Sequence, residues 1–236
     1  MDEATGKVLN SAREEMQQVA QERLAEISKE FKNGFEFLEN YPKSVTFFGG
    51  NQVKESDPSY ADARALASRL VKELKFSVIT GGGPGIMEAA NRGAKESGGN
   101  SIGLLIQLPE AQITNQYITD SFVLYYFFVR KVCLSFSAEA FIFYPGGFGT
   151  LDEFFEIVTL IQTRKVVGVP LICVGSQYWN KLKDFMEQEL LERGAITPDD
   201  LKLFHIVDGH DEIIEIVRQV PVQVVVPLAE SASLSL

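Results

Sequence analysis

Two glycine-rich segments, GGGPG at residues 81–85 and PGGFGT at residues 145–150, are the parts of this sequence best suited to bind an anion. Each follows an apolar run typical of a β-strand and precedes a pattern that predicts a helix. Glycine lets the main chain approach a ligand closely, and the free N–H groups of a first helical turn attract negative charge. We therefore predict that both segments contact a phosphate group, although a tight strand-to-helix turn would by itself also favour glycine.

The spacing within these segments disfavours two common classes of nucleotide-binding protein. A Walker A motif requires Gly-Lys-Ser/Thr, which neither segment contains. Neither segment is a clean GxGxxG motif with an acidic residue about twenty positions later, as NAD-binding proteins have. An ATPase and an NAD-dependent enzyme are therefore weaker interpretations than another phosphate-binding protein.

Glu153 is the acidic residue best placed to act beside the second segment. It follows Thr150 by three positions in the predicted helix 150–162, so both side chains face the same edge of the sheet, whereas Asp152 is turned about 100° away. Thr-x-x-Glu is also a capping box, in which the glutamate accepts from the N–H of the cap residue. A carboxylate beside an anion site is electrostatically unfavourable. Its presence therefore indicates a use, such as binding a sugar hydroxyl, a water or a developing positive charge.

Arg130 and Lys131 supply positive charge after an aromatic run. A charge pair often marks the solvated face of a helix. An arginine after so apolar a stretch more often has a carboxylate or phosphate partner, and we favour that interpretation.

The elements that must position these groups are predicted by alternating patterns. Short apolar runs alternate with helical periods from residue 45 to residue 217, which is typical of a parallel sheet covered on both faces. The predicted strands are 45–48, 76–80, 101–106, 140–144, 169–174 and 204–207; the predicted helices are 60–74, 85–96, 150–162, 179–191 and 211–217. The fold class is therefore α/β, a doubly wound, Rossmann-like parallel sheet, in which the carboxyl ends of the strands share one edge.

Three regions are expected along the chain. Residues 1–42 form an amphipathic helical arm, interrupted near Asn33 and Gly34, that could dock on the domain or on a second subunit. Residues 43–219 form the Rossmann-like nucleotide-binding domain. Residues 220–236 form a tail, with an edge strand followed by disorder.

Composition excludes several further classes. The 236 residues carry a formal charge of −10, from 22 Lys and Arg against 32 Asp and Glu, which argues against nucleic acid as a partner. The acidic, polar start does not resemble a secretory leader, and the uncharged stretch 166–180 is too short for a membrane span. We therefore expect a soluble, cytoplasmic protein without a membrane partner. Cys133 and Cys173 are expected to be buried free thiols, and no metal site is expected.

These motifs resemble those of the Lonely Guy family, the cytokinin riboside 5′-monophosphate phosphoribohydrolases, long labelled lysine decarboxylase-like. Residues 145–153 resemble the PGGxGTxxE signature of the family, and residues 81–87 and 128–131 resemble two other blocks, within a resemblance that covers about residues 44–218. The resemblance implies that Arg130 and Glu153 are the catalytic pair. It implies substrate-binding groups at Gly49, Gly82, Gly83, Gly85, Glu88, Gln112, Lys131, Gly146, Gly147, Gly149 and Thr150.

Two departures from the family pattern concern specificity. Gly50 and Asn51 stand where many relatives have a serine followed by a basic residue. Residues 108–112 resemble an LPxEQ motif with Ala111 in its acidic position. A cytokinin substrate is therefore not implied for this chain.

The implied reaction is cleavage of the N-glycosidic bond of a nucleoside 5′-monophosphate, which gives free base and ribose 5-phosphate. Glu153 suits the stabilisation of an oxocarbenium-like state and the orientation of water, and Arg130 suits positioning Glu153 and the phosphate by charge-assisted hydrogen bonds. No cofactor or metal is required. A decarboxylase is disfavoured, because no lysine stands in a recognisable context for a pyridoxal phosphate Schiff base.

A nucleotide-binding or carrier module without catalysis remains the alternative, because the same segments would serve binding alone. Because the arm and the stretch 122–129 are apolar, and because relatives in the family are at least dimeric, a homo-oligomer is expected.

Overall fold

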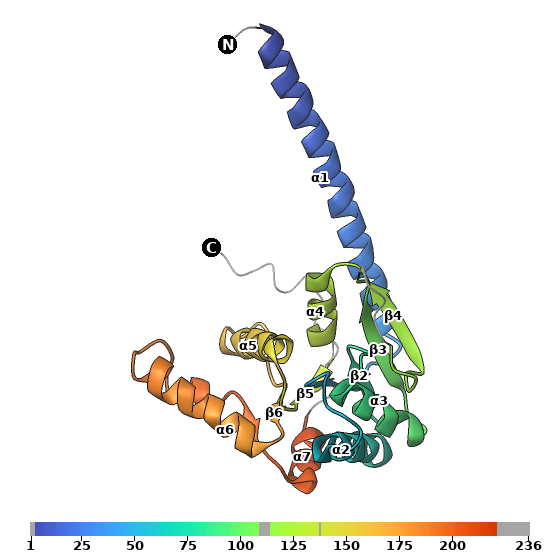
Figure 1. The fold of residues 1–236 in the computed structure, drawn as a ribbon, viewed down its shortest axis with the longest axis vertical. Coiled ribbons are helices and arrows are strands. Elements are labelled where there is room, and N and C mark those ends of the chain that lie inside the picture. The colour runs from blue at the N-terminus through green and yellow to red at the C-terminus, as the bar shows by residue number, and fades with distance from the viewer. Residues whose placement is uncertain (1–2, 109–113, 137, 221–236) are drawn as a thin grey trace.

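The computed structural model describes residues 3–108, 114–136 and 138–220, with side chains from residue 16 onward. The described chain folds into a seven-stranded parallel sheet in the order β4-β3-β2-β1-β5-β6-β7, with helices on both faces (Figure 1). The strands are β1 (Ser44–Phe48), β2 (Ser77–Thr80), β3 (Ser101–Ile106), β4 (Asp120–Leu124), β5 (Ala138–Phe143), β6 (Leu171–Cys173) and β7 (His205–Ile206). The helices are α1 (Glu3–Leu38), α2 (Pro58–Leu74), α3 (Ile86–Glu96), α4 (Phe127–Phe136), α5 (Phe148–Gln162), α6 (Ser176–Phe185) and α7 (His210–Arg218), with a π-helical turn at Met186–Leu191 and a 3-10 turn at Asp200–Lys202.

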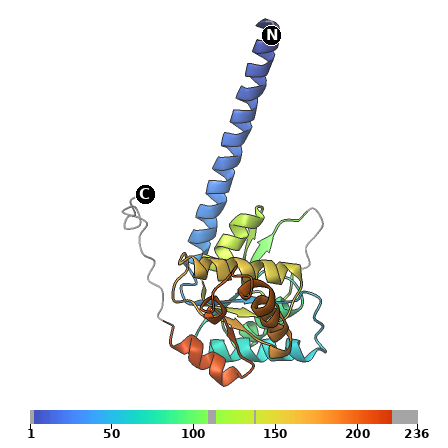
Figure 2. The ribbon, with the colours of Figure 1, turned by 90° about the vertical axis from the view of Figure 1, so that its left-hand side faces the viewer.

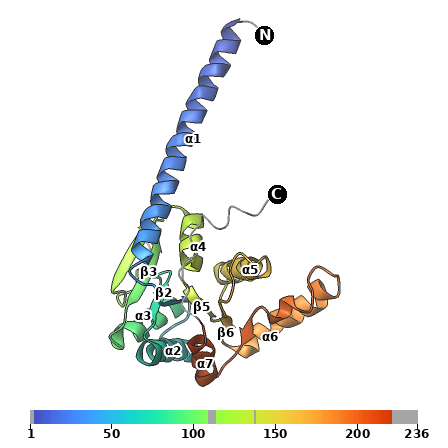
Figure 3. The same cartoon turned by 180° about the vertical axis from the view of Figure 1, so that it is seen from behind.

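Two hydrophobic cores cover the two faces of the sheet, because successive side chains of a strand point to opposite sides. Val45 and Phe47 of β1 belong to the core that α2, α3 and α7 cover. Phe48 of β1 and Phe143 of β5 belong to the core that α1, α4, α5 and α6 cover. The view from behind shows α2 and α7 together at the end of the domain opposite the projecting helix α1 (Figure 3). The predicted α/β fold with helices on both faces is confirmed.

The order of the strands reverses between β1 and β5. From β1 the chain proceeds through β2 and β3 to β4, and it then returns to β5 on the other side of β1. Two hydrogen bonds join the strand ends: Tyr144 N donates to Phe48 O at 2.9 Å, and Gly50 N donates to Pro145 O at 3.0 Å. In an open doubly wound sheet, the crevice where the strand order reverses is the usual place for a ligand.

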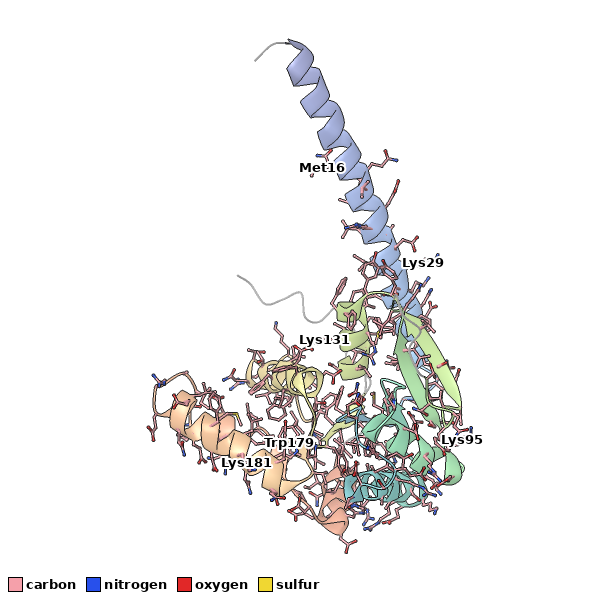
Figure 4. The ribbon with its side chains drawn as sticks, viewed as in Figure 1. Met16, Lys29, Lys95, Lys131, Trp179 and Lys181 are labelled. Carbon is pink, nitrogen blue, oxygen red and sulfur yellow. The ribbon has the colours of Figure 1, made fainter. Side chains whose placement is uncertain are left out.

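Helix α1 is one continuous helix of 36 residues, so the interruption predicted near Asn33 and Gly34 is wrong. Gly34 is buried against α4, where a Cβ atom would lie 2.9 Å from the Sγ atom of Cys133. The glycine therefore permits close packing of two helices and does not break one. The first two thirds of α1 project away from the sheet, with no other described element beside them (Figure 2). Met16 lies on this projecting part, with its side chain 72% exposed (Figure 4).

Strand β4 and helix α4 were not predicted, although they adjoin the candidate site. β4 is an edge strand with mostly exposed side chains, so it has no buried alternation. Its apolar sequence continues directly into α4, which hides the boundary between the two elements. The predicted edge strand of the tail falls on residues 221–236, which lie outside the described part of the chain.

Cys133 and Cys173 are both buried and are not joined in a disulfide, as expected. Of the helices within the described ranges, none is long and apolar enough to cross a membrane.

Candidate active site

A cavity of about 260 Å³ opens at the carboxyl ends of β1 and β5, where the strand order reverses. Its walls come from the end of β1, both glycine segments, α4 and α5. The lining residues are Phe47, Phe48, Gly49, Gly50, Asn51, Gly81, Met87, Arg130, Gly147, Phe148, Gly149, Thr150 and Glu153. The cavity therefore brings together one arginine, one carboxylate and the start of a helix.

Helix α5 presents its N-terminus to this cavity. The helix begins at Phe148 with Gly147 as its N-cap, two residues earlier than predicted, and no side chain caps it. Thr150 is thus inside the first turn, and the capping-box interpretation of Thr150 and Glu153 is wrong. The N–H groups of that first turn have no acceptor within the helix, and no acidic side chain lies in the turn. Free donors and the positive end of the helix dipole therefore meet at the wall of the cavity.

Two main-chain N–H groups in and just after the first glycine segment have acceptors within the protein. Gly82 N donates to the Oγ1 atom of Thr80 at 2.9 Å, and Ile86 N donates to Gly50 O at 3.1 Å. Gly85 has a φ of +73°, and a Cβ atom there would lie 2.3 Å from Gly50 O, so the close packing of the two loops requires glycine. Of this segment only Gly81 lines the cavity. The geometry thus favours the second segment as the anion site and makes the first a supporting wall.

Buried asparagines fix that wall. Asn115 donates from its Nδ2 atom to Gly83 O at 3.0 Å and to the Oδ1 atom of Asn91 at 2.9 Å, and its main-chain N–H donates to Gly82 O at 3.0 Å. The hydroxyl of Thr80 donates to the same Oδ1 atom at 2.6 Å. Because unpaired buried polar groups are costly, this network holds the first glycine segment in one conformation.

Arg130 reaches the cavity from α4 and donates to main-chain carbonyls. Its Nε atom donates to Leu104 O at 2.7 Å and its Nη2 atom to Gly81 O at 3.2 Å. The guanidinium lies so close to Gly81 that a Cβ atom there would be 2.1 Å from Nη2. Burial lowers the pKa of Arg130 and the charge of Glu153 opposes this effect, but a guanidinium remains protonated at neutral pH. The expected hydrogen bond from Arg130 to Glu153 is replaced by these carbonyl contacts, and the two side chains interact by charge.

Glu153 is a partly buried carboxyl group whose pKa is raised. Burial raises its pKa from the ordinary 4.5 to about 7, and the positive charge of Arg130 opposes the rise. Asp152 raises this pKa further, whereas Lys131 lowers it. A carboxyl group that titrates near neutral pH inside a cavity is typical of catalytic sites.

Lys131 does not line the cavity. Its Nζ atom forms ion pairs of 2.8 Å with both Asp152 and Glu156 of α5. Lys131 lies on α4 (Figure 4), so this pair of contacts joins the helix of Arg130 to the helix of Glu153.

The structure places the residues expected at the site in three groups. Those that line the cavity are Gly49, Arg130, Gly147, Gly149, Thr150 and Glu153. Those that lie nearby without lining it are Gly82, Gly83, Gly85, Glu88, Lys131 and Gly146. Glu88 instead accepts a hydrogen bond of 2.8 Å from the hydroxyl of Tyr60. Gln112 and Ala111 lie outside the described residues.

Several residues at the site were not predicted. Met87 and Phe148 line the cavity, and Phe148 is 95% exposed at its mouth. Their positions inside the two glycine motifs were a usable signal. Tyr178 of α6 donates its hydroxyl to Gly146 O at 2.8 Å and so holds the second segment from outside. Neither Tyr178 nor Asn115 carries a sequence signal for this role, because both reach their partners through the tertiary fold.

The described residues contain no cluster of three or more His, Cys, Asp or Glu side chains that could hold a metal ion.

Residues 87–217, more than half of the chain, match a family model described as possible lysine decarboxylase. The chain belongs to this family. Two curated relatives carry the same name, cytokinin riboside 5′-monophosphate phosphoribohydrolase. LOG3 of Arabidopsis thaliana is 31% identical over 163 residues, which are 67% of this chain and 73% of that protein. The Rhodococcoides fascians enzyme is 29% identical over 162 residues, which are 66% of this chain and 80% of that protein. The resemblance to the Lonely Guy family is therefore confirmed.

Solved structures support the fold of this family member. The X-ray structure of TM1055 has a TM-score of 0.57 at 23% identity and covers 75% of this chain and 99% of that chain. The molybdenum cofactor carrier protein of Chlamydomonas reinhardtii has a TM-score of 0.55 at 22% identity. The match covers 75% of this chain and 97% of that chain. At these identities the likeness extends to the fold alone.

The site does not fit pyridoxal phosphate, which the family description would imply. That cofactor needs a lysine to form a Schiff base, and none of the residues that line the cavity is a lysine. Lys131 is engaged by two carboxylates.

Proposed function

We propose that this protein is a nucleoside 5′-monophosphate phosphoribohydrolase, which cleaves the N-glycosidic bond to release free base and ribose 5-phosphate. The observation that carries the proposal is the meeting of the α5 N-terminus, Arg130 and Glu153 in one cavity where the strand order reverses. The names of the curated relatives support the same reaction.

The 5′-phosphate would bind at the start of α5, against the N–H groups of residues 148–150 and near Arg130. Thr150 and Glu153 are separated by about one helical turn, roughly 5 Å along the axis. A ribose bound by its phosphate at the helix start would extend along α5, which brings C1′ toward Glu153. The phosphate thus serves as the anchor that positions the reacting bond.

The carboxylate of Glu153 would stabilise the positive charge that develops on the ribose during cleavage. Cleavage of the glycosidic bond leaves positive charge on C1′ and O4′, which a nearby negative charge stabilises. The same carboxylate can accept a proton from the attacking water, which then adds to C1′ while the departing base gains a proton. A pKa of about 7 means that Glu153 is ionised and active in mildly alkaline solution.

The direct test is incubation with a panel of nucleoside 5′-monophosphates, with chromatography of free base and ribose 5-phosphate. AMP and adenosine form the matched pair of substrates. We expect hydrolysis of at least one monophosphate and far slower reaction of its nucleoside. Equal turnover of the two would contradict the role of the phosphate.

The alternative is a nucleotide-binding or carrier module, which the same panel distinguishes. Calorimetry would then detect binding of a monophosphate, and chromatography would detect no free base. In that case Ala111→Glu, which restores the acidic residue of the related motif, is the first variant to assay.

The assembly that we propose is a homo-oligomer in the cytoplasm. Large apolar side chains of α4 are exposed, with Phe127 and Phe136 each 57% accessible, and the projecting part of α1 exposes more. Buried cysteines outside a disulfide suit a reducing compartment. Light scattering at micromolar concentration tests the assembly, and a monomeric mass would contradict it.

A further inference from the structure

Helix α4, which carries Arg130, obtains the polar contacts at its start from helix α1. Glu30 of α1 accepts two main-chain hydrogen bonds, from Tyr125 N at 2.5 Å and from Tyr126 N at 3.1 Å. No acidic residue of α4 itself lies in its first turn. Glu30 therefore places a negative charge beside the positive end of α4, which the helix does not do with its own sequence.

The connection from Glu30 to Arg130 is short. Tyr126, whose N–H Glu30 accepts, itself accepts at its carbonyl from the N–H of Arg130 at 3.1 Å, which closes the first turn of α4. A single residue, Tyr126, thus links the carboxylate of Glu30 to the main chain of Arg130 through two hydrogen bonds. The direction of the Arg130 side chain toward Gly81 and Leu104 depends on where that first turn lies.

Apolar contacts between α1 and α4 support the same position. The rings of Phe31 and Phe128 lie 6.3 Å apart, and those of Phe35 and Phe136 lie 4.8 Å apart. Gly34 lies directly against Cys133. Phe128, Cys133 and Phe136 lie at the start, middle and end of α4, so these apolar contacts hold the helix along its length, and Glu30 adds a polar contact at its start. An open depression of about 470 Å³, lined by Glu26, Lys29 and Glu30 among others, borders this junction.

We propose that Glu30 is a positioning residue for Arg130, so that the N-terminal helix α1 sets the geometry of the active site through the first turn of α4. The inference deepens the proposed function, on which its kinetic part rests. Glu30 touches neither the cavity nor a ligand there, and it acts only through α4.

The experiment compares Glu30→Ala, Glu30→Gln and Arg130→Ala with the parent in the full-length chain. The matched control is Glu36→Ala, which removes an exposed glutamate of the same helix whose carboxylate lies 3.7 Å from the Nζ atom of Lys32. In Glu30→Ala we expect kcat for the preferred monophosphate to fall about 10- to 100-fold, because displacement of a positioned group by about 1 Å has effects of that size. Glu30→Gln, which keeps one acceptor, should lie between Glu30→Ala and the parent.

A second readout reports the position of Arg130 without any turnover. The pKa of Glu153, followed by carboxyl ¹³C NMR and assigned by its loss in Glu153→Gln, is lowered by Arg130 and Lys131 of α4 and raised by Asp152 and Glu156 of α5. Because Glu30→Ala moves Arg130 away, that pKa should rise above about 7, as in Arg130→Ala. A merely structural loss of stability would leave the pKa of the folded protein unchanged.

The double variant Glu30→Ala/Arg130→Ala tests whether Glu30 affects the reaction through Arg130 or independently of it. If Glu30 acts through Arg130, the double variant should behave like Arg130→Ala alone, both in rate and in the pKa of Glu153. Independent, multiplicative losses would overturn the proposal, and so would a Glu30→Ala protein with parental rate and parental pKa. If Glu30→Ala does not fold, Glu30→Gln carries the comparison. If the parent hydrolyses no monophosphate, the proposed function fails, while the NMR titration still decides whether Glu30 positions Arg130.

Discussion

Replacement of Glu153 by glutamine should make the protein more stable and nearly inactive at the same time. The glutamine keeps the shape of the side chain and removes its charge. The pKa of Glu153 is about 7 in the folded protein against an ordinary value of 4.5, because burial disfavours the ionised form. One pKa unit corresponds to about 1.4 kcal/mol, so the ionised carboxylate costs the folded state about 3 kcal/mol at high pH. Because Glu153 partly faces the cavity, we expect about 2 kcal/mol.

The sign of this effect depends on pH. Below pH 4.5 the carboxyl group is protonated in both the folded and the unfolded chain, so Glu153→Gln should change stability little. Between pH 4.5 and about 7 the unfolded chain loses its proton first, and the parent loses stability as the pH rises. Above about pH 7 the full difference remains. The variant should therefore exceed the parent in free energy of unfolding at pH 8 and match it near pH 4.5.

The assay is urea unfolding of parent and variant at pH 5 and pH 8, followed by circular dichroism, with hydrolysis measured at pH 8. We expect the rate to fall about 10²- to 10³-fold while monophosphate affinity changes little, as for other preorganised electrostatic contacts. Glu36→Gln, which neutralises an exposed glutamate of α1 that does not line the cavity, is the control for general loss of negative charge. A variant that is less stable than the parent at pH 8, or whose stability differs from the parent equally at both pH values, would refute the raised pKa assigned to Glu153.

Three further predictions concern the same cavity. In Arg130→Ala the midpoint of the pH–rate profile should move to higher pH, because the charge that lowers the pKa of Glu153 is gone; an unchanged midpoint would show that Arg130 does not act on Glu153. Gly149→Ala should leave unfolding temperature equal or higher, since a Cβ atom there meets open space, yet weaken monophosphate binding in calorimetry. Asn115→Ala should lower the free energy of unfolding by about 1–3 kcal/mol, because Gly83 O and Asn91 lose a buried donor; a smaller loss in urea unfolding would mean that water replaces it.

The sequence by itself determined the fold class and the placement of Thr150 and Glu153 on one face of a helix. Strands that are apolar on both faces can be recognised without a structure, and they require a parallel sheet whose carboxyl ends meet. The spacing of Thr150 and Glu153 is local, so the helical period alone places them on one face. Membership of the family was likewise visible, because the motif at residues 145–153 is contiguous.

The tertiary structure decided which groups remain free to act. The two glycine segments have similar sequences. In the first, Gly82 N donates to Thr80 and the carbonyls of Gly82 and Gly83 accept from Asn115, whereas the second leaves the N–H groups of the first turn of α5 open to the cavity. The low helix propensity of Gly34 predicted a break, but packing against Cys133 outweighs that preference. The contact of Glu30 with the start of α4 joins residues 95 positions apart in the chain. Periodicity reports which face of an element is buried, whereas the identity of a side chain's partner depends on how distant elements pack, and that information is not local.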